Sequence, residues 1–234
     1  MSNNSSAPTL GGKKKLGVLA VTLLIIAASA PLTAIAGGVT TALAVTGNIG
    51  IPLGYIVLLV ALVIFAVGYA AMSRFITNAG AFYAYISQGL GRPLGVGSSL
   101  VAFGIAAFMG FESGALYGEE SKNPKTTIAR ATYLGVLIIG IFYAISSWAM
   151  IVGVGQDNVV TIAAEQGPGL FFGFLGGTVG QIIADLASLL FITSLFAALL
   201  SFHNAVARYS FSLGREGVLP KGLAKVRKNS GAPW

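Results

Sequence analysis

Few residues of this sequence could do chemistry in an apolar environment, and they fall into two short groups. In the first group, Pro31 follows Ser29 and Ala30 in a long apolar stretch, and a proline has no N–H with which to continue a helix. In the second group, Glu112 lies deep in another apolar stretch, shortly after Gly110. An ionised carboxylate at the centre of a bilayer costs about 3 kcal/mol, so Glu112 is expected to be protonated, paired or facing water.

Other reactive sites are not indicated. The sequence has no cysteine, which excludes disulfides, thiolate metal sites and cysteine nucleophiles. His203 is the only histidine and cannot form a metal site alone, so a local hydrogen-bonding role is favoured. Neither the spacing of a serine nucleophile elbow nor a phosphate-binding P-loop is present. We therefore predict that the protein is not an enzyme and has no cofactor.

The chain is rich in apolar stretches long enough to cross a membrane. It is 55% hydrophobic and 9% charged, and no charged residue lies between Lys15 and Arg74. A membrane-spanning helix needs about 20 apolar residues. Five stretches are candidate spans, namely 16–45, 52–73, 93–118, 131–155 and 178–204. We predict an all-α, polytopic transmembrane helix bundle over residues 16–204, between a cytoplasmic N-terminal tail, 1–15, and a basic cytoplasmic tail, 205–234.

Breaks inside the first apolar stretch are as informative as its length. Ser29-Ala30-Pro31 and Gly37-Gly38 interrupt it, and a turn rich in glycine follows at 47–52. Helices broken at membrane depth are tolerated where they line a cavity or are covered by protein. This pattern indicates a transport site.

The net charge of +7 could suggest nucleic-acid binding, but the positions of the basic residues argue against it. They lie at the edges of apolar stretches or in the last thirty residues, the distribution that orients a membrane protein. Lys13 to Lys15 place the N-terminus in the cytoplasm. The C-terminal tail either contacts anionic lipid headgroups or only sets the topology, and the second interpretation is favoured.

The charge pattern conflicts with a simple count of spans. Arg92 and the group Lys122, Lys125 and Arg130 all favour the cytoplasm, yet one apolar stretch, 93–118, separates them. Three explanations remain open. The stretch forms a re-entrant or hairpin path, the charge rule is broken, or an odd number of spans has been lost from this part of the chain, which we favour.

Four separated motifs resemble the amino acid–polyamine–organocation (APC) permeases. In chain order, they are Ala28-Ser29-Ala30-Pro31-Leu32, the segment from Asn78 to Pro93, the run from Phe108 to Pro124, and the run from Ser201 to Pro220. The run Gly110-Phe111-Glu112-Ser113 with Gly118-Glu119-Glu120-Ser121-Lys122-Asn123-Pro124 is the most specific. By resemblance, helices one, two, seven and eight are present. Parts of helices three to six and the last four helices are missing, so the expected fold is a partial inverted-repeat core.

The resemblance implies a substrate site between two discontinuous helices. Free N–H groups at the first break would hold a carboxylate, because a helix N-terminus carries unpaired donors and partial positive charge. Freed carbonyls at the second break would accept an ammonium group. The implied residues are Ser29, Ala30, Pro31, Leu32, Thr33, Phe108, Met109, Gly110, Phe111 and Glu112.

Simpler roles remain open for these residues. Pro31 could form an ordinary kink, Phe108 could be a gate or a plain core aromatic, and Glu112 could serve proton coupling or a structural hydrogen bond. Thr193 and Ser194 could offer hydroxyl oxygens to a sodium ion, although hydrogen bonds to their own backbone are favoured. Coupling to H⁺ or Na⁺ is therefore left unassigned.

The function that this pattern favours is secondary active transport of amino acids or related amines by alternating access. The protein would lie in the cell (inner) membrane as a multi-pass protein, with a lipid bilayer and a small substrate as partners and no nucleic acid. The alternative is a transport-incompetent membrane fragment or interaction module. Missing helices would leave uncovered faces, which favours a homo-oligomer.

Overall fold

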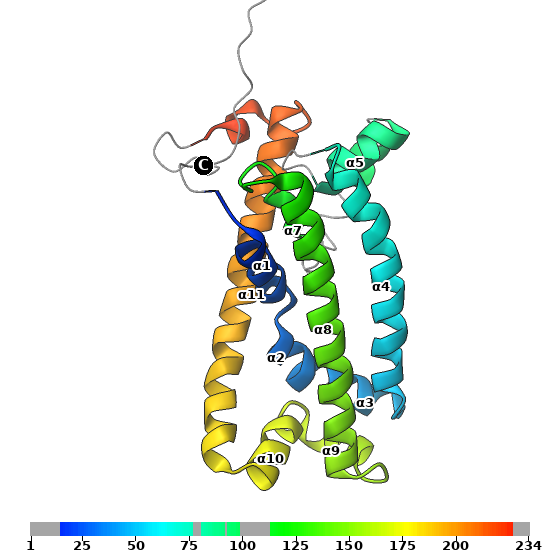
Figure 1. The fold of residues 1–234 in the computed structure, drawn as a ribbon. Helices are drawn as coiled ribbons and strands as arrows, with labels where there is room; N and C mark the ends of the chain where they lie inside the picture. The colour runs from blue at the N-terminus through cyan, green and yellow to red at the C-terminus, as the bar shows by residue number, and fades with distance from the viewer. Residues whose placement is uncertain (1–14, 77–80, 92, 99–112, 227–234) are drawn as a thin grey trace, which may run out of the picture. The chain divides into compact units, whose positions relative to one another are not determined.

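The chain folds into helices joined by short turns in the computed structural model, which describes residues 15–76, 81–91, 93–98 and 113–226 (Figure 1). No strand is present in these ranges. The described elements are α1 (Val18–Ser29), α2 (Pro31–Thr33), the π-helix η1 (Ala34–Val39), α3 (Thr40–Thr46), α4 (Ile51–Ser73), α5 (Ala81–Leu90), α7 (Ser113–Leu116), α8 (Pro124–Val154), α9 (Val159–Gln166), α10 (Gly169–Thr178), α11 (Gln181–Arg215) and the 3₁₀ helix η2 (Lys221–Ala224).

Four segments in the described part of the chain are long and apolar enough to cross a membrane. They are Val18–Thr46, Ile51–Ser73, Pro124–Val154 and Gln181–Arg215. In the most apolar 18-residue stretch of α4, only 6% of the residues are buried, so most of this helix presents apolar side chains outward. Such a surface suits a lipid environment. The expected all-α membrane bundle is thus confirmed as a fold class, while most of the predicted stretch 93–118 lies outside the described residues.

The turn between the first two of these segments follows from its sequence. Gly47 ends α3 with a φ of 63°, a left-handed conformation that glycine adopts without steric cost. The side chain of Asn48 then accepts a hydrogen bond of 2.7 Å from the N–H of Gly50. The helix α4 begins one residue later, at Ile51. The predicted turn is confirmed at 47–50, whereas Pro52 lies in the first turn of α4.

The chain divides into two compact units. Unit 1 comprises Met1–Ala28, Ala66–Leu134 and Leu200–Trp234, and unit 2 comprises Ser29–Phe65 and Gly135–Leu199. Helices α4, α8 and α11 each begin in one unit and end in the other.

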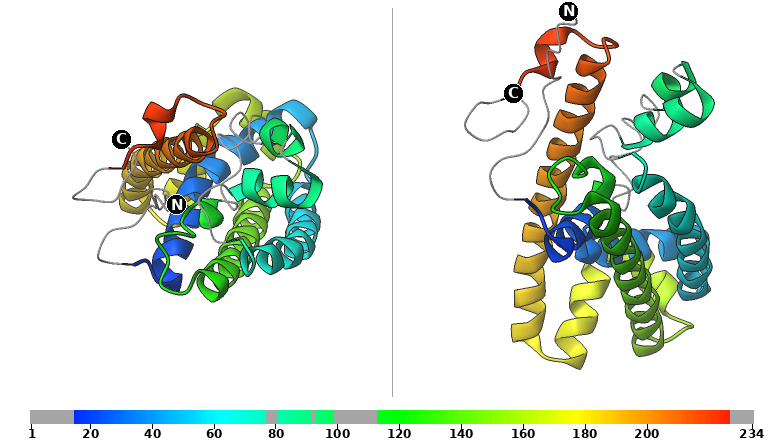
Figure 2. Two further views of the ribbon diagram at one scale, coloured as in Figure 1. Left: turned by 90° about the horizontal axis from the view of Figure 1, so that it is seen from above. Right: turned by 45° about the horizontal axis from the view of Figure 1, so that its top comes forward.

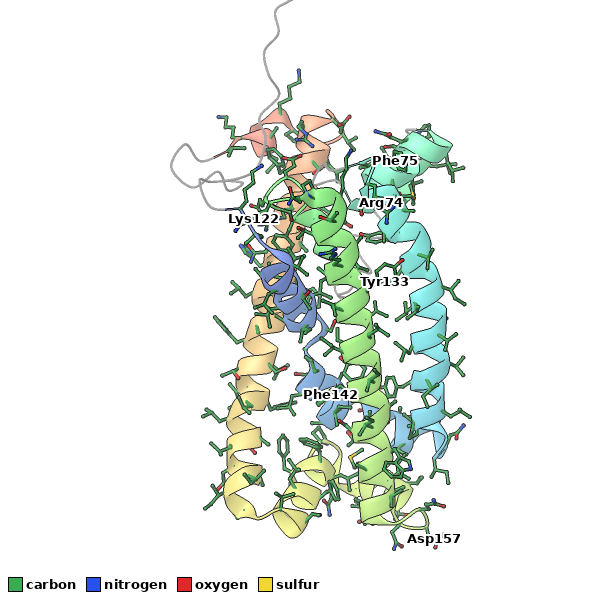
Figure 3. The ribbon with its side chains drawn as sticks, viewed as in Figure 1. Arg74, Phe75, Lys122, Tyr133, Phe142 and Asp157 are labelled. Atoms are coloured by element: carbon green, nitrogen blue, oxygen red, sulfur yellow. The ribbon has the colours of Figure 1, made fainter. Side chains whose placement is uncertain are left out.

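The two units differ sharply in charge. Unit 2, which is described throughout, contains no lysine or arginine, and its charged residues are Asp157, Glu165 and Asp185. Asp157 lies in the turn after α8 (Figure 3). Arg74 and Lys122 both belong to unit 1. In the sequence they lie on either side of the apolar stretch 93–118, whose number of crossings the sequence leaves open.

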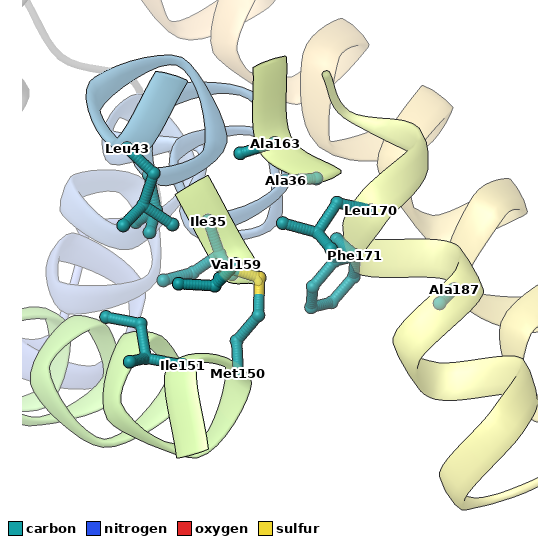
Figure 4. Packing of buried hydrophobic residues seen from close by; sticks show 11 residues of the cluster. Ile35, Ala36, Leu43, Met150, Ile151, Val159, Ala163, Leu170, Phe171 and Ala187 are labelled. Atoms are coloured by element: carbon teal, nitrogen blue, oxygen red, sulfur yellow. The ribbon is translucent and has the colours of Figure 1, made fainter. Parts of the chain in front are cut away.

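Unit 2 has a closely packed apolar core built by short helices. The helix α3 packs against α9, and η1 packs against α10, which follows α9 in the chain (Figure 2). The buried cluster combines side chains from η1, α3, α8, α9, α10 and α11 (Figure 4). Its members are Ile35, Ala36, Val39, Leu43, Met150, Ile151, Val159, Ala163, Leu170, Phe171 and Ala187. This core fixes the segment that directly follows the break at Pro31.

In unit 1 the N-terminal segment joins the loop before α8. The N–H of Leu16 donates to the carbonyl of Glu120 at 2.8 Å, and the N–H of Lys122 donates to the carbonyl of Leu16 at 2.9 Å. These bonds make a single parallel bridge between Leu16 and Ser121. These bonds join the first chain segment of unit 1 to this loop in its second segment.

Candidate functional site

The first apolar segment is broken where its sequence predicts. The helix α1 ends at Ser29, Ala30 adopts φ 41° and ψ 63°, and Pro31 starts the next helical turn. Ala30 is the only non-glycine residue with a positive φ in the described part of the chain. A left-handed conformation costs an alanine about 1–2 kcal/mol, so the surrounding structure must hold it in place. The predicted interruption at Ser29-Ala30-Pro31 is confirmed.

A second irregularity follows directly. Residues Ala34–Val39 form a π-helix, a wider turn that is often found at functional sites. The hydroxyl of Thr40, which is fully buried, donates to the carbonyl of Ala36 at 2.6 Å and lies 3.1 Å from the carbonyl of Gly37. The sequence indicated an irregularity at Gly37-Gly38, and the structure confirms it as a π turn.

A tyrosine hydroxyl donates a hydrogen bond to a backbone carbonyl at the end of α1. The hydroxyl of Tyr143, on α8, donates to the carbonyl oxygen of Ser29 at 2.8 Å. The ring of Tyr143 packs against the ring of Tyr55, on α4, with centroids 5.3 Å apart. Both tyrosines also pack against the apolar core of unit 2. The end of α1 is thereby attached to side chains that are themselves held in place.

One hydroxyl group of α11, that of Ser194, lies close to the break. The hydroxyl oxygens of Thr33 and Ser194 lie 3.4 Å apart, which is a long hydrogen bond. The neighbouring Thr193 instead donates to the carbonyl of Leu190, one turn earlier on its own helix, at 2.9 Å. Of the two sodium candidates, the structure brings only Ser194 to the predicted substrate segment.

The break presents two opposite partial charges within a short distance along the chain. Carbonyl oxygens at the end of α1 carry partial negative charge, and N–H groups in the first turn after Pro31 carry partial positive charge. The first helical bond of the new turn runs from the N–H of Ala34 to the carbonyl of Ala30, at 3.0 Å. Leu32 and Thr33 precede it, where a helix supplies no acceptor of its own. Such an arrangement suits a small zwitterion.

The predicted second half of the site cannot be compared in this way. Phe108, Met109, Gly110, Phe111 and Glu112 lie outside the described residues. The five residues of the first half, 29–33, all belong to unit 2. No group of three or more histidine, cysteine or acidic residues that could hold a metal ion occurs within the described ranges.

Unit 1 contains a separate cluster of charged side chains. Arg208 forms an ion pair with Glu120 at 2.7 Å, and Arg215 forms one with Glu119 at 2.9 Å. The guanidinium of Arg208 also lies 4.3 Å from the centre of the Tyr117 ring. These contacts attach the end of α11 to the loop before α8.

The environment of Tyr117 changes its acidity. Burial raises the pKa of its phenol above the ordinary value of 10.0, Arg208 lowers this pKa, and Glu120 raises it. Burial is the largest cause, so the phenol stays neutral over the physiological pH range. The neutral Tyr117 ring can therefore stack on the Arg208 guanidinium, while Glu120 alone supplies the negative charge that pairs with it.

Sequence reasoning missed Tyr143 as a residue of the site. Tyr55 lies near the beginning of the stretch 52–73, a position typical of an aromatic anchor at a membrane interface. Tyr143 carries a different signal, because it is a polar group near the middle of the apolar stretch 131–155. A hydroxyl at that depth needs a hydrogen-bond partner, and a broken neighbouring helix supplies one.

Comparison with known proteins gives the family. Residues 97–234 match the model of the amino acid permease family. The chain is 28% identical over 124 residues to the branched-chain amino acid permease BcaP of Lactococcus lactis subsp. cremoris, an alignment that covers 51% of this chain and 25% of the relative. It is 26% identical over 151 residues to BcaP of Bacillus subtilis, covering 61% of this chain and 30% of the relative.

No solved structure matches the chain. The aligned part spans less than a third of either relative's length. The family model nevertheless covers more than half of this chain, and the long apolar helices agree with a multi-pass membrane protein. The chain therefore belongs to the amino acid permease family of the APC superfamily.

Proposed function

We propose that this chain takes part in secondary active transport of an amino acid, by alternating access around the break between α1 and α2. The observation that carries the proposal is the left-handed turn at Ala30, inside a segment long enough to span a membrane, in a chain of the amino acid permease family. Ser29, Ala30, Pro31, Leu32 and Thr33 would hold the substrate's charged groups through their backbone. Phe108 to Glu112 would supply the second half of the site.

A branched-chain amino acid is the proposed substrate. The two relatives reported above carry this substrate in their names. The apolar cluster of unit 2 packs against Leu32, beside the break, which supports an aliphatic rather than a charged substrate side chain. Related amines are the competing substrates that the transport assay must include.

Membrane, orientation and coupling form part of the same proposal. We place the chain in the cell membrane with its N-terminus in the cytoplasm, because unit 2 carries no basic residue. Coupling would use H⁺ or Na⁺, and the paired hydroxyls of Thr33 and Ser194 support sodium. A second copy of the chain is the proposed partner for exposed apolar surface such as that of α4.

The test is uptake of radiolabelled leucine by proteoliposomes that contain the purified chain, with an imposed proton or sodium gradient. Ala30→Val is the site variant, because a β-branched residue disfavours a positive φ strongly and would remove the break. Ala61→Val is the matched control, since Ala61 is exposed on α4. We expect Ala30→Val to lose most uptake and Ala61→Val to retain it.

Two results would contradict the proposal. Absence of leucine uptake and of leucine binding by the wild-type chain would favour the alternative of an interaction module. Equal uptake by Ala30→Val and Ala61→Val would remove the break from the mechanism while leaving transport itself intact.

A further inference from the structure

The broken end of α1 leaves a carbonyl group that needs a partner. In an unbroken helix the carbonyl of Ser29 would accept a bond from the N–H four residues later. The turn at Ala30 directs the chain away from this path, and an unsatisfied carbonyl within an apolar segment costs several kcal/mol. The Tyr143 hydroxyl meets this need at 2.8 Å.

The position of that hydroxyl is itself constrained. Tyr143 lies within the long helix α8, and its ring packs against the ring of Tyr55 at 5.3 Å between centroids. Its neighbourhood includes the apolar core of unit 2, in which Met150 and Ile151 of the same helix are buried. The donor therefore comes from a rigid support, whereas the acceptor belongs to a strained turn.

We propose that Tyr143 is the positioning residue of the substrate segment, holding Ser29 and thereby Ala30 in the conformation that exposes the backbone groups of the break. This inference rests on the proposed function for its effect on transport, although its structural part does not. Tyr143 acts through Ser29 and Ala30. The Tyr55 ring supports it by limiting the orientation of the phenol.

The mechanism predicts a specific kinetic effect. Without the hydroxyl, a smaller fraction of molecules has the break in its binding-competent conformation, so the apparent affinity falls by that fraction. Tyr143→Phe is expected to raise KM for leucine about threefold to tenfold, the range that one hydrogen bond provides. Maximal uptake per folded molecule should stay near the wild-type value, whereas a merely structural role would lower the amount of folded protein and leave KM unchanged.

The matched control is Tyr133→Phe, which removes a tyrosine hydroxyl from the same helix at a half-buried position in unit 1. It should leave KM unchanged. A rescue variant sharpens the test, because glycine adopts positive φ at no steric cost. Ala30→Gly combined with Tyr143→Phe should restore part of the lost affinity.

Hydrogen exchange in lipid nanodiscs separates this inference from the proposed function, since it needs no substrate. Tyr143→Phe should speed amide exchange at residues 32–34 at least threefold relative to both the wild-type chain and Tyr133→Phe. Equal exchange in the two variants overturns the inference whether or not the chain transports leucine. If the wild-type chain shows no uptake but Tyr143→Phe alone speeds exchange, the inference on the break stands and the proposed function fails.

Discussion

Arg208 and Glu120 illustrate how single residues hold distant segments of unit 1 together. Their side chains are only 10% and 16% exposed, and Arg208 also stacks on Tyr117. Removing one partner of a buried ion pair leaves the other charge without compensation, and such changes cost about 3 kcal/mol. We expect Arg208→Met to lower the melting temperature of the chain in detergent by several degrees.

Two controls accompany this variant, one at an exposed lysine and one that changes both partners of the ion pair. Lys125→Met removes an exposed charge in the first turn of α8 and should change the free energy of unfolding by less than about 0.5 kcal/mol. The double variant Arg208→Met with Glu120→Gln should be less destabilised than Arg208→Met alone, because no unpaired charge remains. If Arg208→Met and Lys125→Met melt alike, the ion pair does not stabilise unit 1.

At the scale of elements, the sequence specifies breaks well and their partners poorly. Pro31 and Gly37-Gly38 mark irregular helix locally, because one lacks an N–H and the others lower the cost of unusual backbone. The structure has its left-handed turn and its π-helix at these places. Long-range partners such as Tyr143 and Ser194 are set by packing between helices, which no local pattern encodes.

The ion pairs of unit 1 were likewise not predictable from local sequence patterns. In the sequence, Glu119 and Glu120 belong to one family motif, and Arg208 and Arg215 belong to another motif and to the basic C-terminal tail, with no sign that they pair. Their pairing joins residues about ninety positions apart in the chain. Charged residues are almost never fully buried unless they are paired, but only the fold determines which residues form the pair.

Close packing between α4 and α8 in unit 2 leads to a prediction at this scale. A Cβ atom at Gly140 would lie 2.6 Å from the Cδ1 and 3.0 Å from the Cβ of Leu59, so the helices approach closely there. Gly140→Ala should therefore destabilise the chain by about 1–3 kcal/mol through overpacking. Thermal unfolding of the detergent-solubilised chain measures the change.

Gly54→Ala is the matched control on α4, since an added Cβ at Gly54 meets no atom within 4 Å. Alanine is a better helix former than glycine, so this variant should be neutral or more stable by about 0.5–1 kcal/mol. Opposite signs for the two glycines are expected. A stabilising effect of Gly140→Ala would mean that the two helices are not packed as closely as the structure shows.

For the whole molecule, the separation of charge between the two units bears on topology. Unit 2 contains three acidic residues and no basic ones, whereas Arg74 and Lys122 both belong to unit 1. Cytoplasmic segments of membrane proteins carry an excess of lysine and arginine. The sequence alone left the side of Lys122 open, because the number of crossings between Arg92 and Lys122 could not be counted. In the described part of the chain, every lysine and arginine belongs to unit 1, so we expect these residues to lie on one side of the membrane.

Single cysteines can test this topology without background, since the natural sequence has none. Thr126 and Gln156 are both exposed and lie near opposite ends of α8, one in unit 1 and the other in unit 2. With the N-terminus in the cytoplasm, an impermeant maleimide added to intact cells should label Gln156→Cys and spare Thr126→Cys until the cells are opened. The reverse pattern would invert the proposed orientation. Labelling of both positions in intact cells would mean that α8 does not cross the membrane, and the assignment of its two ends to opposite sides would then be wrong.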